Sequence, residues 1–195
     1  MNFNDYLKES SRTDLNFDGY FSTRSRFGDL AAVTHFAIGL TTEACELMEC
    51  WNFSACDWED QVHAREEVGD MWWYIAGIAR LRPSVASGIS GLDHWLPWLG
   101  SNDITNMVVK SGDVLDQVKR GIYYGRFDYE VFDQKVLGAA ELLVGISTSL
   151  GGAKSIMESN ILKLRTRYPD SFSANLAIER DVEAERRALE GGHGG

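Results

Sequence analysis

The chain of 195 residues has little proline, little cysteine and no long apolar run. Only three prolines occur, so long stretches can form uninterrupted helix. The three cysteines, Cys45, Cys50 and Cys56, form an odd set without a CxxC pair, which argues against a disulfide framework or a zinc site and indicates a reducing compartment. Because a membrane span needs ~20 consecutive apolar residues, we expect no membrane segment.

Positive charge is also scarce. The sequence has 19 Lys and Arg against 29 Asp and Glu, a formal net charge of −10. An acidic surface argues against sequence-independent binding to nucleic acid, but a small anionic substrate can still bind where metal ions bridge it to carboxylates. The polar start of the sequence, MNFNDYLKESSRTDL, does not look like a signal peptide. We therefore expect a cytoplasmic protein that binds neither nucleic acid nor membrane.

Apolar residues recur every three or four positions along most of the chain, which is the pattern of amphipathic helices. No alternating pattern of the kind that strands show stands out. The predicted fold class is therefore all-α, with a four-helix-bundle core and shorter helices attached. The expected helices cover residues 29–51, 57–81, 104–123, 129–150 and 153–168.

One helical domain is expected over residues 1–170, with a first helix pair over 29–82. Residues 83–102 are rich in Gly, Ser and Pro and are predicted to form a connector. A second helix pair would cover 103–150. Residues 171–195 carry Glu and Arg at helical spacing, which predicts a solvated C-terminal helix or a partner surface, followed by a flexible tail.

Two pairs of acidic residues lie on consecutive predicted helices. Glu43 and Glu46 are three residues apart, as are Glu67 and Asp70, so each pair shares a helix face. Both pairs adjoin the apolar stripe, whereas solvated acids favour the opposite face. If the two helices are antiparallel neighbours, four carboxylates converge, and a divalent cation such as Mg²⁺ or Mn²⁺ would relieve their repulsion.

The alternative interpretation of these acids is plain surface charge, because either motif alone is common on solvated helices. The occurrence of both motifs beside apolar stripes favours the ligand set. The other acids nearby, Glu49, Glu59 and Glu66, are interpreted as surface charge.

A mostly basic segment, SNILKLRTRYP, contains Asn160, Lys163, Arg165 and Arg167. Lys163 and Arg167 are four residues apart and share a face, from which they can contact phosphates beside the metals. Compensation of the helix dipole before Pro169 explains the same charges equally well.

One histidine and several tryptophans lie near the acidic helices. His35 precedes Glu43 by about two helical turns, and a lone histidine there is more typical of packing than of catalysis. Trp72 and Trp73 belong to a tryptophan-rich group that we expect to be mostly core, with one or two members available to stack on a base.

Three segments resemble the MazG-like all-α nucleoside triphosphate pyrophosphohydrolases. They are THFAIGLTTEACELME (34–49), REEVGDMWWYIAGIA (65–79) and SNILKLRTRYPDSFS (159–173), and they match the family's order of ExxE, ExxD and a later Asn/Lys/Arg segment. The matches cover about half of the chain or less. The resemblance implies a four-helix core of the MazG or dimeric-dUTPase type and a homo-oligomer, either a dimer or a tetramer.

The resemblance also implies a reaction and a role for each matched residue. Members of the family cut a (deoxy)nucleoside triphosphate to the monophosphate and pyrophosphate with Mg²⁺, for which Mn²⁺ substitutes. Carried over, Glu43, Glu46, Glu67 and Asp70 would be catalytic metal ligands. In the helix predicted over 153–168, Asn160, Lys163 and Arg167 would bind the substrate.

Three functions stay open. The tryptophan-rich surroundings favour a purine substrate such as dGTP in phage or bacterial nucleotide metabolism. A dUTP or dCTP pyrophosphatase of the same superfamily is the nearest alternative. A non-catalytic helical bundle that binds a nucleotide or a partner is the third.

In the compact form of the family the Asn/Lys/Arg segment follows soon after ExxD, but here about ninety residues intervene. They align with the first helix pair as a degenerate copy, which places Asp113 and Asp116 on the ExxE acids and Gly138 and Glu141 on the ExxD acids. A true repeat predicts a pseudo-dimeric bundle within one chain. A false one makes the middle an insertion and favours a site completed by a second chain.

Overall fold

A computed structural model of the chain describes residues 1–13, 26–55, 57–92, 101–173, 175, 176, 179 and 181–191. For residues 26–29, 101, 190 and 191 it describes the backbone but not the side chains. Cys56, residues 93–100 of the expected connector and the last four residues of the expected flexible tail therefore lie outside the described residues.

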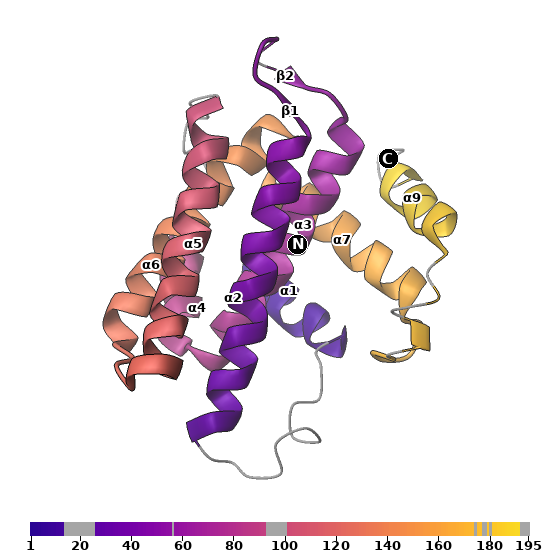
Figure 1. Ribbon diagram of the computed structural model, residues 1–195. Coiled ribbons are helices and arrows are strands. Elements are labelled where there is room, and N and C mark those ends of the chain that lie inside the picture. Colours follow the sequence, from indigo (N-terminus) through magenta and orange to yellow (C-terminus); the bar gives the residue numbers. More distant parts are fainter. Residues whose placement is uncertain are drawn as a thin grey trace.

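The described chain is mostly helical, which confirms the all-α prediction (Figure 1). Its helices are α1 (Phe3–Ser10), α2 (Arg26–Glu49), α3 (Gln61–Leu81), α4 (Pro83–Ser90), α5 (Ser101–Tyr124), α6 (Tyr129–Ser149), α7 (Ala153–Arg167) and α9 (Val182–Gly191). A 3₁₀ turn, Ser11–Thr13, follows α1.

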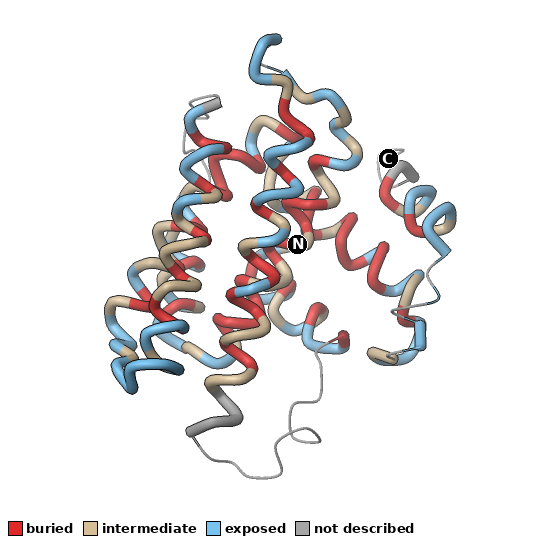
Figure 2. The backbone as a smooth tube through the Cα atoms, in the orientation of Figure 1, coloured by how far each residue is buried: buried red, intermediate tan, exposed pale blue. Residues whose placement is uncertain are grey.

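Four long helices form the body of the molecule. The hairpin of α2 and α3 packs against the hairpin of α5 and α6 through contacts of α2 with α5 and of α3 with α6. Figure 2 shows that the buried residues follow the inward sides of these helices, as their apolar spacing predicts. Helices α1, α4 and α7 pack on α3, and α9 packs on α7 (Figure 1).

Polar side chains determine where α3 and α6 begin. The carboxylate of Asp60 accepts hydrogen bonds from the backbone N–H groups of Val62 and His63 at the start of α3. Asp128 does the same at the start of α6. Each cap satisfies donors that have no partner within the first turn of a helix.

Two glycines separate α6 from α7. Gly151 and Gly152 have φ values of 95° and 97°, a region in which residues with a Cβ are strained.

Among the described residues, no single helix is long and apolar enough to cross a membrane. Helices α6 and α7 pass that test only as a pair, and the pair bends by 91° at these glycines.

The structure corrects the expected connector over 83–102. Its first part forms α4, because a proline at the first helical position is favourable and because Val85 and Ile89, one turn apart, are both buried. The glycines and serines that suggested a loop are small residues on a packed helix: a Cβ at Gly88 would lie 2.5 Å from Leu137.

Helix α1 and a short hairpin were not expected from the pattern of the sequence. The strands β1 (Trp51–Asn52) and β2 (Asp57–Trp58) pair antiparallel between α2 and α3. The rings of Trp51 and Trp58 meet edge to face with centroids 4.7 Å apart, so the hairpin has its own apolar contact.

Two observations bear on the internal repeat, which stays a prediction. The helices α2 and α5 both have 24 residues, and α3 and α6 both have 21. Thr41, which the alignment pairs with Ser111, donates a hydrogen bond to the Ser111 carbonyl at 3.3 Å. Contact between equivalent residues is what a two-fold axis between the two pairs would produce.

The close approach of α2 and α3 generates a prediction. A Cβ at Gly77 would lie 2.4 Å from the ring of Phe36, whereas a Cβ at Gly112 in α5 would meet nothing within 4 Å. We expect Gly77→Ala to destabilise the protein by about 1–3 kcal/mol, because the packed ring must move. The matched change Gly112→Ala should stabilise it by about 0.5–1 kcal/mol through helix propensity. Urea unfolding measures both, and equal effects of the two changes would contradict the packing.

Candidate functional site

The contact between α2 and α3 sets the register of the acidic residues. Gly77 faces Phe36, and Gly39 faces Tyr74, so the two helices run antiparallel with small residues at the crossing. Seven residues on from Phe36 in α2 is Glu43, and seven residues back from Gly77 in α3 is Asp70. The same register brings Glu46 level with Glu67. The two acidic pairs therefore meet across one helix interface.

Three of the four predicted ligands converge. One carboxylate oxygen from each of Glu43, Glu46 and Glu67 lies within 4.8 Å of the others. Glu67 is buried, Glu43 is half-buried and Glu46 is exposed, so the cluster opens to solvent on the α2 side. Among the described residues this is the one group of acids, histidines or cysteines that meets the distance requirement for a metal.

The carboxyl groups of Glu43 and Glu67 are hydrogen-bonded to each other. Burial raises the pKa of Glu43, and the hydrogen bond and the neighbouring carboxylates raise it further. Burial also raises the pKa of Glu67, although its hydrogen bond with Glu43 acts in the opposite direction. His63, one turn before Glu67, brings its Nε2 within 2.7 Å of Glu67 Oε1. Glu43 and Glu67 together therefore retain a proton more readily than two solvated glutamates.

The fourth predicted ligand, Asp70, is held from α7. Its Oδ1 accepts a hydrogen bond from Asn160 Nδ2 at 2.7 Å, and its Oδ2 lies 2.5 Å from Lys163 Nζ. Lys163 is fully buried and also reaches Glu66 Oε1 at 3.2 Å. Burial by itself would lower the pKa of Lys163, but Asp70 and Glu66 outweigh that effect and raise it.

Asn160 is oriented in turn by α1. The hydroxyl of Tyr6 donates to Asn160 Oδ1 at 2.7 Å, so the amide nitrogen faces Asp70. Burial raises the pKa of Tyr6 well above its usual value, which keeps this donor protonated. Asn160 is only 2% exposed, and its side chain contacts Asp70 rather than open space. Residues far apart in the sequence thus fix the direction of one carboxylate.

A cavity of about 450 Å³ lies beside the acidic cluster. It is lined by five acidic residues, Glu43, Glu46, Glu66, Glu67 and Asp70, and by Arg167 from the end of α7. Aromatic residues, including His35, Trp73, Tyr168 and Phe172, line it as well. The lining therefore combines carboxylates, one guanidinium and aromatic rings.

His35 is packed, as expected, and it also lines this cavity. Its ring lies 6.3 Å from that of Trp73 and 5.8 Å from that of Tyr74, centroid to centroid. Burial lowers the pKa of His35, which favours the neutral imidazole. Trp73 is fixed by a hydrogen bond from its Nε1 to Thr13 Oγ1 at 2.9 Å.

A larger hollow of about 1270 Å³ lies elsewhere, at the turn between α5 and α6. Charges there pair with each other: Asp116 lies 2.5 Å from Lys119 Nζ and 2.6 Å from Arg120 Nε. Asp113, on the same helix, pairs with Lys135 at 2.6 Å. Asp113 and Asp116, two of the three acids assigned to the degenerate second copy, thus have basic partners of their own.

Several placements differ from the sequence interpretation. Glu66, interpreted as surface charge, contacts Lys163 and lines the cavity, because its turn of α3 faces α7. Arg165 pairs with Glu9 on α1 at 2.5 Å. Arg167 pairs with Glu185 on α9, a helix expected to be solvated. The roles of Tyr6 and Glu185 have no signal in the sequence, whereas the four-residue spacing of His63 and Glu67 does suggest contact.

Comparisons with protein-family models, with curated proteins and with solved structures gave no match for this chain. The resemblance to the MazG-like enzymes therefore remains a prediction based on three motifs.

The raised pKa values of Glu43 and Glu67 predict how stability depends on pH. Because the pKa of Glu43 and of Glu67 is raised on folding, the native state binds more protons than the unfolded chain above their usual value of 4.5. The free energy of unfolding, measured with a chelator present, should therefore fall by roughly 1–3 kcal/mol between about pH 5 and about pH 8.

Chemical denaturation at several pH values measures this slope. Glu43→Gln should reduce it, because the amide cannot ionise, and should leave the contribution of Glu67, whose pKa is raised mainly by burial. Glu49→Gln changes an exposed glutamate of the same helix, outside the cluster, and should leave the slope unchanged. Equal slopes in the two variants would show that the acidic cluster is not its source.

Proposed function

We propose that this chain is a Mg²⁺-dependent pyrophosphohydrolase that converts a (deoxy)nucleoside triphosphate to the monophosphate and pyrophosphate, with Mn²⁺ as a substitute metal. The observation that carries the proposal is the meeting of carboxylates from α2 and α3 with the guanidinium-bearing Arg167 of α7 around one cavity. A triphosphate needs both: metal-binding oxygens on one side and a guanidinium or ammonium group on the other.

The donor set fits a hard divalent cation. Every candidate ligand is a carboxylate oxygen, and three of them already lie within 4.8 Å of one another. A proton held by Glu43 or Glu67 would leave on binding, since a ligating carboxylate must be ionised. A bound cation would supply charge for the phosphate oxygens and lower the pKa of a coordinated water.

The other residues have distinct tasks in this proposal. Lys163 and Asn160, both buried, keep the two oxygens of Asp70 pointing in fixed directions, so Asp70 can serve as a ligand or as a proton acceptor. Arg167 is the cation that lines the cavity, and it would contact the phosphates. Lys163 therefore acts on the substrate through Asp70 rather than by contact.

The reaction itself needs one water molecule. Its oxygen forms a bond to the α-phosphorus, the bond from that phosphorus to the bridging oxygen breaks, and pyrophosphate leaves with the electron pair. A carboxylate of the cluster accepts the proton of the water. The acidic residues that line the cavity would hold the phosphates during this step.

The aromatic residues that line the cavity support a nucleotide rather than an inorganic polyphosphate. His35 and Trp73 are among these residues, and a base can stack on an aromatic ring. A volume of about 450 Å³ lies within the usual range for small-molecule sites. Comparison of the common NTPs and dNTPs as substrates would decide between a purine preference, with dGTP as the example, and the dUTP or dCTP alternative.

Metal binding predicts a thermal shift. With Mn²⁺ at about one hundred times its dissociation constant, linkage adds about 2.7 kcal/mol of stability. For a domain of this size that corresponds to a rise of about 5–10 °C in the unfolding midpoint. Glu46→Gln should remove most of the rise, and Glu49→Gln should keep it. A rise that is equal in both variants would locate the metal elsewhere.

The activity test uses each common NTP and dNTP, first with Mg²⁺ and then with Mn²⁺, and separates the products by chromatography. We expect monophosphate and pyrophosphate from one or a few substrates. In ¹⁸O-labelled water the label should enter the monophosphate, because attack is at the α-phosphorus. Release of orthophosphate and the nucleoside diphosphate would contradict the proposed bond cleavage.

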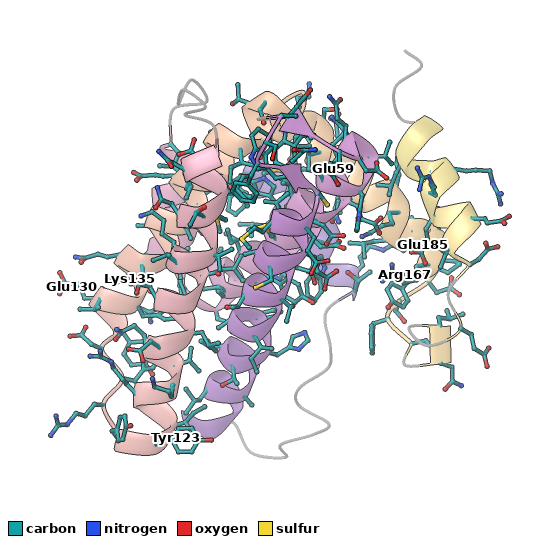
Figure 3. The ribbon with its side chains drawn as sticks, turned by 45° about the horizontal axis from the view of Figure 1, so that its top comes forward. Glu59, Tyr123, Glu130, Lys135, Arg167 and Glu185 are labelled. Carbon is teal, nitrogen blue, oxygen red and sulfur yellow. The ribbon has the colours of Figure 1, made fainter. Side chains whose placement is uncertain are left out.

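Glu67→Gln should lower kcat by about a hundredfold or more, because it removes a cluster carboxylate without changing its size. The control is Glu59→Gln. Glu59 is an exposed glutamate whose carboxylate accepts a hydrogen bond from Asn52 in the hairpin (Figure 3). Full activity of Glu67→Gln would rule out this site. Tight metal and nucleotide binding without turnover in the wild type would instead favour the non-catalytic bundle.

A further inference from the structure

Arg167 reaches the cavity from the last residue of α7, so its backbone is supported by helix on one side only. Its side chain has several rotatable bonds and loses much rotamer freedom when it binds a ligand. The position of the guanidinium therefore depends on what it contacts. Figure 3 shows Arg167 and Glu185 lying together where the C-terminal helix faces α7.

Glu185 holds the guanidinium in a two-point contact. Arg167 Nε donates to Glu185 Oε1 at 2.8 Å, and Arg167 Nη2 donates to Glu185 Oε2 at 2.5 Å. The side chains are 15% and 3% exposed, respectively. A fork of this kind fixes the plane of the guanidinium as well as its distance.

The carboxylate of Glu185 contacts Arg167 but does not line the cavity, whereas Arg167 itself does. The fork uses the Nε hydrogen and one Nη2 hydrogen, and a guanidinium has five N–H donors. Donors on Nη1 are therefore not consumed by Glu185. If Glu185 blocked the site instead, we would expect its carboxylate to lie between Arg167 and the acidic cluster.

Helix α9 is anchored independently of this pair. Asp181 accepts a hydrogen bond from the Ala184 N–H at 2.9 Å and so caps the helix start. Leu189 is buried, and Arg186 lies 3.8 Å from Asp60, the residue that caps α3. Glu185 is thus presented from a helix that packs on α7 and contacts α3, which carries part of the acidic cluster.

We propose that Glu185 is a positioning residue: it holds Arg167 in the orientation in which the guanidinium binds the polyphosphate of the substrate. This inference rests on the proposed function, because it takes the cavity to be a triphosphate site. Preorganisation of this kind raises affinity by reducing the ordering that binding requires. The opposite arrangement, in which Glu185 competes with the substrate for Arg167, predicts the opposite sign for its removal.

The test measures the dissociation constant of tripolyphosphate in the presence of Mg²⁺ by isothermal titration calorimetry. We expect Glu185→Gln and Arg167→Ala each to weaken binding about tenfold, since each loses a charge-assisted contact or its alignment. The double variant should be no weaker than Arg167→Ala alone, because Glu185 acts only through Arg167. Mn²⁺ affinity should not change in any of them.

Glu183→Gln is the matched control. Glu183 is on the same helix, and its side chain is 90% exposed. Its carboxylate lies 3.6 Å from Arg187 Nη1. Its removal should leave tripolyphosphate binding unchanged. Glu185→Asp is a second variant that keeps the negative charge but withdraws the carboxylate by one methylene. It should also weaken binding, whereas a role in charge balance alone predicts wild-type affinity.

The outcomes separate the two proposals. If the wild type and Arg167→Ala behave as expected but both Glu185 variants bind as tightly as the wild type or more tightly, the positioning role is wrong and the proposed function stands. If Glu185→Gln still weakens binding in the Arg167→Ala background, the effect does not pass through Arg167 and the inference fails. If the wild type does not bind tripolyphosphate with Mg²⁺, the triphosphate site itself is wrong. A lower unfolding midpoint with an unchanged dissociation constant would show a structural role only.

Discussion

Repulsion among carboxylates between α2 and α3 is the constraint on which the rest of the structure depends. One carboxylate oxygen from each of Glu43, Glu46 and Glu67 lies within 4.8 Å of the others, and burial together with neighbouring carboxylates raises the pKa of Glu43 and of Glu67. Asp70 reaches the same interface and is balanced by the buried Lys163. Partly buried negative charge of this density is costly to a fold, so its retention points to use of the cluster rather than to stability.

The surrounding helices are arranged around α3, which carries half of this charge. Helix α1 supplies Tyr6, which orients Asn160, and α7 supplies Asn160, Lys163 and Arg167. Helix α9 adds Glu185, which pairs with Arg167. Together these helices supply the residues beside the acidic interface, and Arg167 and several aromatic residues line the cavity there. Hydrogen bonds run from Tyr6 through Asn160 to Asp70.

Much of the fold follows from local pattern. The apolar spacing predicted the four long helices to within a few residues, and the fold class with them, because an amphipathic stripe is a local property. The same reasoning missed α4, where buried Val85 and Ile89 outweigh a composition typical of loops, and it missed the short hairpin before α3. It also assigned Glu66 to the surface, since nothing in the neighbouring residues indicates that α7 covers that side of α3.

The sequence by itself determined the helices, the two acidic pairs and their adjacency to apolar stripes, because each depends on residues within a few turns of one another. Only the tertiary structure decided which of those acids are buried enough to have a raised pKa, which one pairs with a lysine and which arginine lines the cavity. Tyr6, Asn160 and Glu185 are separated from their partners by other elements along the chain. Their contacts depend on how the helices pack, and packing is a property of the whole molecule rather than of any segment.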